Sequence, residues 1–497
     1  MGKNKNKIKL IIMIVTTVFS FTSMSDAFFL KGYSAIPWFL LSALTYFVPY
    51  LFIVSDLTSV YNDRNGGIYT WLKDSTSQRL AFVATLLWYS SYFIWMISLF
   101  MKTWIPLSIL LFGKDITQES VLLGNIPTMA VIAVLSIVLV FLISLVILGG
   151  FQKILDISFF SGRCLLFLVS LMGIGSLFCL TGHHGDMATS LQVNPLFSSQ
   201  GKFQTPTENL SFFIFGITAF GGLDTVACLV NNTGELKKKF SKLVVACGGA
   251  IITLYIAGIV LWGASIDLSR FVDGDQFHLG NLMYGLMGQL ALNIAEVGGF
   301  SQGMTTLLLQ VFLRLTALTL FTAYLSLLSI ISFGPLQAIT QGLKETRLKA
   351  SLQRVNRKGI TILPVIIQGI GLGVFILLIS LSQKTISGFY NQLTLMTNIS
   401  RSIPYLLVAL SYPAFKRLYP TNRELSFVNP KRNVYLFSIS VSLSVALSIF
   451  FSVYEKIAVH EFLNASLLLF GPVVFALLGA WFFKFCEEKP AYHHGKL

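Results

Sequence analysis

Two apolar stretches of the sequence carry polar residues at positions where hydrocarbon disfavours them. The stretch 8–30 holds a run of hydroxyl side chains in its second half and then Asp26. The stretch 207–231 holds a pair of glycines and then Asp224. Glycine costs about 1 kcal/mol in a helix interior, and a carboxylate costs at least about 2.5 kcal/mol inside a membrane. We therefore expect the second stretch to be a broken helix whose freed backbone groups face a cavity.

The hydroxyl-rich stretch 8–30 has an alternative interpretation, because serine and threonine can hydrogen-bond to the carbonyls of an unbroken helix. Its position in the chain favours a break. The two stretches are the first and the sixth apolar runs, which are corresponding positions in two sets of five. Interruptions at corresponding positions are typical of transporters built from inverted repeats, with a binding site near the middle of the membrane.

The overall composition indicates a membrane protein with several spans. Of the 497 residues, 54% are hydrophobic and only 11% are charged, whereas a soluble protein carries about 25% charged residues. The net charge of +15 comes from basic residues in short segments between apolar runs. That pattern is typical of membrane topology signals rather than of a nucleic-acid-binding face. We expect the lipid bilayer as a partner and no nucleic acid.

Twelve apolar runs have the length of about 20 residues that a spanning helix needs. They lie near 8–30, 36–60, 80–110, 126–148, 155–180, 207–231, 243–265, 302–333, 359–382, 392–414, 433–453 and 461–485. Lysines precede the first run, as in a secretory signal, but no clear cleavage site follows it and eleven more runs do. Most of the 36 lysines and arginines share a side with the N-terminus. We therefore expect a multi-pass protein of the cytoplasmic membrane with both termini in the cytoplasm.

The sequence shows no pattern for metal binding, disulfides or enzyme chemistry. Its five cysteines have neither a CxxC spacing nor a cysteine–histidine spacing typical of zinc. No HExxH-like motif and no Ser/His/Asp arrangement lies within the apolar runs. We expect no metal, no cofactor and no enzymatic activity.

Several motifs resemble the amino acid–polyamine–organocation (APC) permeases. The segment GGIYTWLKDS, between the second and third runs, is similar to the G-G-x-Y-x-W signature of their cytoplasmic loop. The signature residues are Gly66, Gly67, Tyr69 and Trp71. The segments ITAFGGLDTV and GPLQAITQG resemble the family's sixth helix and the stretch after its eighth helix. Within the family, the chain looks most like the glutamate/γ-aminobutyrate antiporters and their inner-membrane permease relatives.

The resemblance implies an all-α integral membrane fold of about 12 helices. The first ten would form two inverted five-helix repeats, about 8–180 and 207–414, with discontinuous first and sixth helices in a LeuT-like arrangement. Residues 1–430 would form the transporter core. Residues 431–497 would add two helices and a short cytoplasmic tail.

The resemblance also implies a binding site at the two breaks. The first helix would offer backbone N–H groups to a substrate carboxylate, and the sixth would offer carbonyls to an α-ammonium group. The first role falls on Ser20, Phe21, Thr22, Ser23 and Met24, and the second on Thr218, Ala219, Phe220, Gly221 and Gly222. Thr218 stands where relatives often carry a large aromatic gate. Tyr92, Trp95 and Tyr324 are further candidates for the pocket wall; the alternative for the first two is an interface belt or helix packing.

Four charged residues inside the runs are candidates for gating or coupling. The resemblance places Arg163 where a lysine commonly fills the place of a sodium ion; alternatively, this arginine snorkels to the inner face. Arg314 would pair with an acidic group, for which Asp26 is the nearest candidate, or attract an anionic substrate, or sit near the outer interface. Asp224 would be a gate, a proton site or a structural partner, of which we favour the first and the last.

These features predict a secondary active transporter of a small amino acid or related amine. It would work by alternating access, as an antiporter or with proton coupling, and without sodium. A polyamine or organic-cation carrier is an alternative, which the small number of acids within the runs disfavours. A transporter-like membrane sensor without turnover is another.

Overall fold

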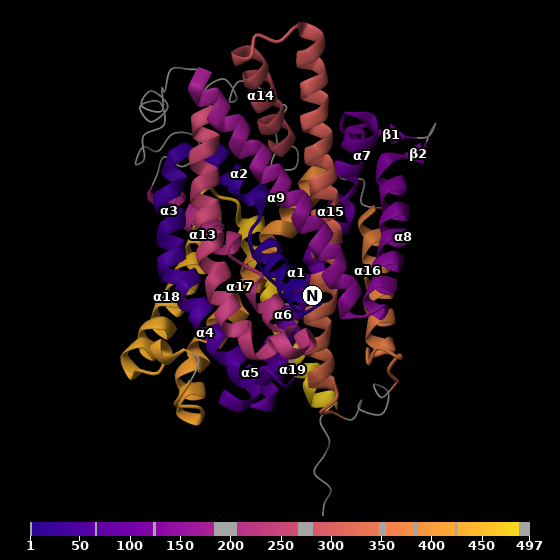
Figure 1. Ribbon diagram of the computed structural model, residues 1–497. Coiled ribbons are helices and arrows are strands. Elements are labelled where there is room, and N and C mark those ends of the chain that lie inside the picture. Colours follow the sequence, from indigo (N-terminus) through magenta and orange to yellow (C-terminus); the bar gives the residue numbers. More distant parts are fainter. Residues whose placement is uncertain are drawn as a thin grey trace, which may run out of the picture.

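A computed structural model describes residues 2–64, 67–122, 126–182, 206–266, 282–346, 354–380, 386–422 and 425–486. These residues are almost entirely helical, apart from a short antiparallel hairpin of β1 (Val121–Leu122) and β2 (Ile126–Pro127). The long helices share one general direction (Figure 1). The hairpin and α14 (Leu282–Val297) lie at one end of the bundle, and α5 (Ile68–Ser75) lies at the other. We call these the α14 end and the α5 end.

Two sets of helices follow one another along the chain. The first set comprises α1 (Gly2–Val18), α2 (Phe21–Lys31), α3 (Ala35–Ser42), α4 (Val48–Val60), α6 (Gln78–Lys102), α7 (Trp104–Phe112), α8 (Thr128–Leu148) and α9 (Phe151–Gly182). The second set comprises α11 (Pro206–Ala219), α12 (Leu223–Ala227), α13 (Phe240–Ser265), α15 (Gln302–Leu343), α16 (Ile362–Ser380) and α17 (Ile386–Leu418). Two further helices, α18 (Lys431–Ala458) and α19 (Phe462–Cys486), complete the described chain.

All twelve expected runs are helical in the described chain. Within it, nine stretches are long and apolar enough to cross a membrane. The stretch Asn6–Val60 contains the first two expected runs. The sixth run forms a shorter apolar helix over Phe212–Ala227, and the tenth forms α17. The prediction of an all-α membrane protein of about twelve spans is therefore confirmed.

Burial separates the inner helices from those that face lipid. In the most apolar window of the stretch Gln78–Phe112, 72% of the residues are buried, against 28% in Ile362–Ser380. Accordingly α6 packs against α15, α17 and α19, whereas α16 packs mainly on α8 and exposes large apolar side chains such as Ile367. A belt of such exposed apolar residues suits contact with lipid chains, because the bilayer interior is itself apolar.

The first and the sixth spans are both interrupted, as the sequence predicts. α1 ends before Phe19 and Ser20, and three residues separate the end of α11 from the start of α12. Gly222 adopts φ 103°, a conformation that costs little only for glycine. A Cβ at Gly222 would lie 2.9 Å from the carbonyl oxygen of Thr17. The two breaks therefore touch each other at the centre of the bundle.

The G-G-x-Y-x-W motif, residues 66–71, packs against other segments at the α5 end. Gly66 lies outside the described residues. Gly67 adopts φ 46°, and a Cβ there would overlap the thiol of Cys228 just beyond α12. The Tyr69 hydroxyl donates to Glu345 Oε2 at 2.6 Å, and the Trp71 side chain is buried. The motif thus fixes α5 against the sixth and eighth spans.

A buried ion pair joins the second and tenth spans at the α5 end. Lys416 Nζ lies 2.9 Å from Asp56 Oδ2, and both side chains are less than 10% exposed. The Tyr412 hydroxyl donates to Asp56 Oδ2 at 2.8 Å, and the Asn422 amide donates to Asp56 Oδ1 at 2.6 Å. The carboxylate is thus fully hydrogen-bonded, which is the condition for burying it.

We expect Lys416→Met to lower the melting temperature of the detergent-purified protein strongly. Removing one partner of a buried pair leaves an uncompensated charge and costs about 3–5 kcal/mol. Lys114→Met is the matched control, because the Lys114–Glu119 pair is exposed and such pairs contribute about 0–1 kcal/mol. Equal effects of the two substitutions would contradict the structural role of the buried pair.

Candidate functional site

The break in the first span leaves two backbone donors available. The Ser20 side chain caps α2 by accepting a hydrogen bond from the Ser23 N–H at 3.1 Å. The first helical bond runs from the Met24 N–H to the Ser20 carbonyl, also at 3.1 Å. Among the described residues, no partner is found for the N–H groups of Phe21 and Thr22. Free N–H groups at a helix N-terminus form an anion-binding site.

The break in the sixth span leaves two backbone acceptors available. The last turn of α11 is tightened by hydrogen bonds from Phe220 N–H to Ile217 and from Gly221 N–H to Thr218. In the described part of the chain, the carbonyls of Phe220 and Gly221 accept no hydrogen bond. Free carbonyls at a helix C-terminus carry partial negative charge and suit an ammonium group.

A tyrosine that the sequence analysis missed holds the two breaks together. Tyr255 of α13 is fully buried, and its hydroxyl accepts the Ser20 N–H at 3.0 Å and donates to the Ala219 carbonyl at 2.7 Å. Two of the backbone groups that we expected to bind substrate are therefore occupied by Tyr255. The only signal in the sequence is that Tyr255 is the one tyrosine within the apolar run 243–265.

Several predicted site residues contribute packing rather than polar contacts. The ring of Phe220 stacks on Phe47 with centroids 4.6 Å apart. Phe21 lies against Trp262, and Met24 is buried against Gly258 of α13. At Phe21 the backbone, not the side chain, remains available to a substrate.

Neutral donors surround the carboxylate of Asp224. It receives hydrogen bonds from the indole N–H of Trp88, from the Tyr92 hydroxyl at 3.4 Å and from the Tyr405 hydroxyl at 3.2 Å. Asp224 is fully buried, and these donors come from α6 and α17. A carboxylate held in this way from two other helices fits the interpretation of a structural partner.

The structure brings Tyr92 and Trp95 of α6 to the break in the sixth span. Tyr92 is fully buried, and its hydroxyl accepts a hydrogen bond from Thr225 at 2.7 Å. This position excludes the interface-belt interpretation for Tyr92, because a belt residue reaches the headgroups. The ring centroid of Trp95 lies 5.8 Å from that of Tyr92, so the two rings share one face of the helix.

An arginine that our candidate residues omitted lies at the same place. The guanidinium of Arg401, midway along α17, covers the ring of Trp95 at 4.9 Å from its centroid. Its Cζ would be 3.6 Å from a Cβ at Gly221. Asp224, Tyr92, Tyr405 and Tyr46 are the groups within its electrostatic reach. The signal in the sequence was a basic residue inside an apolar run.

The structure does not place Arg163 between the helices that would enclose a sodium site. Its side chain is exposed, with the guanidinium 4.8 Å from the ring centroid of Phe159. The face of α9 that meets α1 is instead lined by small residues, and a Cβ at Gly162 would overlap Ile12. A helix turns successive residues by about 100°, so the residue next to Gly162 points away from α1.

Of the alternatives for Arg314, the pairing with Asp26 is not found among the described residues. Arg314 is exposed, and its guanidinium lies 3.6 Å from the position of a Cβ at Gly113, the residue that follows α7. The cation that acts on Asp26 is Lys102 of α6. Lys102 lies 5.8 Å from the ring centroid of Tyr324, which places Tyr324 with this charged group near the α14 end.

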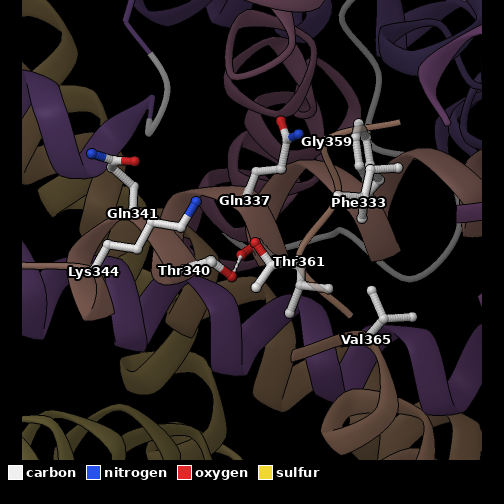
Figure 2. Close-up of a pocket in the computed structure, with 10 residues that line it drawn as sticks. Phe333, Gln337, Thr340, Gln341, Lys344, Gly359, Thr361 and Val365 are labelled. Atoms are coloured by element: carbon white, nitrogen blue, oxygen red, sulfur yellow. Dashed lines mark hydrogen bonds between the residues drawn. The ribbon is translucent and has the colours of Figure 1, made fainter. Parts of the chain in front are cut away.

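The pocket drawn in Figure 2 lies away from the two breaks. Its walls come from the end of α15 and from the segment 359–365, and Gln337, Gln341 and Lys344 contribute polar groups. It adjoins Glu345 and therefore belongs to the α5 end. Among the described residues, no three His, Cys, Asp or Glu side chains gather as metal ligands.

Comparisons with known proteins identify a matching family and several relatives. The sequence profile of the family described as "Amino acid permease" matches residues 6–475. The inner membrane transporter YjeM of Salmonella typhimurium is 34% identical over 486 residues, covering 96% of this chain and 95% of that protein. YjeM of Escherichia coli is 33% identical with the same coverage. The aspartate/glutamate permease AcaP of Lactococcus lactis is 25% identical over 80% of this chain and 76% of its own.

A solved structure supports the fold. A Na⁺-coupled sialic acid symporter, in a substrate-bound outward-open state, matches 89% of both chains with a TM-score of 0.52. The sequence identity is 15%, so this likeness shows the fold alone. Together with the discontinuous first and sixth spans, it confirms the LeuT-like arrangement.

We expect Tyr255→Phe to destabilise the protein, because the Ser20 N–H and the Ala219 carbonyl would lose their partner inside the membrane. An unsatisfied buried polar group costs about 1–3 kcal/mol. The change should lower the melting temperature in detergent. Tyr454→Phe is the control, since Tyr454 is 43% exposed on α18. A Tyr255→Phe protein as stable as the control would show that the hydroxyl does not hold the breaks.

Proposed function

Because the chain belongs to the amino acid permease family, and is therefore a membrane transporter rather than an enzyme, we propose that it carries a small amino acid by alternating access. The proposal rests on the pair of breaks. The free N–H groups of Phe21 and Thr22 and the free carbonyls of Phe220 and Gly221 lie on two helix ends that one tyrosine hydroxyl bridges. An amino acid carries a carboxylate and an ammonium group on one carbon, and these two groups match the two helix ends.

The relatives and the charge distribution support a proposed location and orientation in the membrane. The YjeM proteins are named inner membrane transporters, which favours the inner membrane for this chain. Lysines such as Lys73, Lys237 and Lys416 lie at the α5 end, so we assign that end to the cytoplasm, together with both termini.

The coupling mode is proposed as antiport or proton coupling without sodium. This part of the proposal rests on the resemblance to APC permeases. Arg163 no longer contributes to it, because its exposed side chain does not occupy the place of an ion. Asp224 supports coupling only indirectly, as the group that ties the sixth span to the third and the tenth.

The alternative of a polyamine or organic-cation carrier is disfavoured by Arg401. A fixed positive charge at the break of the sixth span repels a cationic substrate. A membrane sensor with the same fold remains a second candidate, since it would bind the ligand at the same groups and complete no transport cycle.

Counterflow in proteoliposomes separates these functions. Vesicles loaded with a mixture of unlabelled amino acids should accumulate a labelled member of that mixture, at the same rate with sodium, potassium or choline outside. Ligand binding without counterflow would favour the sensor. Uptake that requires a sodium gradient would contradict the proposed coupling.

Phe21→Pro tests the contact of the first break with the substrate. Proline at the first helical position keeps the helix and removes only its N–H, and the extended conformation of Ser20 accepts a following proline. Phe21→Ala is the control, because it removes the same ring and keeps the N–H. A hydrogen bond to a charged group contributes about 1.5–3 kcal/mol, so the apparent affinity should fall at least about tenfold below that of the control. Equal affinities would refute the contact.

A further inference from the structure

Arg401 is a cation in the centre of the bundle that lacks a counter-ion. In the described part of the chain, no carboxylate lies within ion-pair distance of its guanidinium and no hydrogen-bond acceptor is found for it. Asp224 is within electrostatic range, but its oxygens accept hydrogen bonds from Trp88, Tyr92 and Tyr405. The five N–H donors of the guanidinium are therefore available to an acceptor that the described residues do not supply.

The guanidinium of Arg401 contacts an aromatic ring and lies next to the break in the sixth span. Its Cζ lies 4.9 Å from the centroid of the Trp95 ring, a cation–π contact that engages no hydrogen-bond acceptor. The same group lies next to Gly221, where a Cβ would be 3.6 Å from its Cζ and 3.0 Å from the Thr218 carbonyl oxygen. The guanidinium and the free carbonyl of Gly221 thus lie beside each other at the break.

Two buried hydroxyls near Arg401 also lack a partner. Tyr46 and Tyr50 are 0% and 2% exposed, and neither hydroxyl has a hydrogen-bond partner among the described residues. Their rings stack at 5.5 Å, and both contact the ring of Tyr405. Tyr46 is within electrostatic reach of Arg401. Buried hydroxyls are normally hydrogen-bonded, so the missing acceptor is a second and independent indication of a ligand group at this place.

A carboxylate satisfies both sets of donors. It accepts two parallel hydrogen bonds from an arginine edge and has further lone pairs for a tyrosine hydroxyl. The α-carboxylate of the substrate is already assigned to the N–H groups of Phe21 and Thr22. We propose that Arg401 and Tyr46 bind the side-chain carboxylate of an acidic amino acid. The transported substrate is then a dicarboxylic amino acid, an inference that rests on the proposed function.

The test compares acids with their neutral amides. Thermal shift and counterflow are measured with aspartate and glutamate, and with asparagine and glutamine, which have nearly the same size and lack the second negative charge. In the wild-type protein, the acids should bind at least tenfold more tightly than the amides. Arg401→Gln should weaken binding of the acids about 10- to 100-fold and leave that of the amides within about twofold. Arg163→Gln is the control, because it removes an exposed arginine and should change neither.

Tyr46→Phe provides a second variant that conserves packing. It should weaken binding of the acids several-fold, leave that of the amides unchanged and remain informative if Arg401→Gln does not fold. Equal weakening of acids and amides by Arg401→Gln would show that Arg401 binds the α-carboxylate, which would overturn the inference. Wild-type preference for neutral amino acids would also overturn it while leaving the proposed function intact. Transport of no amino acid at all would reject the proposed function itself.

Discussion

The hydroxyl of Tyr255 is the contact on which the centre of the structure depends. A membrane offers no water to a broken helix, so each backbone group that a break releases needs another partner. Tyr255 accepts from one half-helix and donates to the other, and this pairing satisfies one donor and one acceptor at once. Only a few groups remain for a ligand, namely the N–H groups of Phe21 and Thr22 and the carbonyls of Phe220 and Gly221. The tyrosine therefore both stabilises the breaks and limits what they can bind.

The spans and the breaks were predictable from the sequence because the apolar membrane interior restricts which residues can lie within it. An apolar run of about 20 residues has few interpretations, and paired glycines beside Asp224 are costly in a continuous span. The direction of single side chains was not predictable in this way. Arg163 differs from Gly162 by one position, yet one faces outward and the other faces α1. Which residue of a helix faces the core depends on how neighbouring helices pack, and a run that is apolar on all sides carries little periodic signal.

The basic residues within the spans show the same limit. Arg163 and Arg314 are exposed, Lys102 acts on Asp26 near the α14 end, and Arg401 lies at the centre. By sequence all four are positive charges inside apolar runs. Only the packing of α17 against α6 distinguishes Arg401, because it places the guanidinium over Trp95 and beside Gly221. Tyr255 escaped prediction for a related reason, since a tyrosine in an apolar run is most simply interpreted as packing.

The buried pair of Lys416 and Asp56 bears on the difference between the conformational change of an empty carrier and that of a loaded one. The pair joins the second and the tenth spans at one end of the bundle, so any motion that parts these two spans there has to separate two desolvated charges. An empty carrier gains nothing that offsets this separation, whereas a loaded one has the binding free energy of its cargo. Such a barrier slows the return of an empty carrier more than that of a filled one. Such a bias favours the exchange of one solute for another, one of the coupling modes proposed above, and it would arise from a contact far from the binding site.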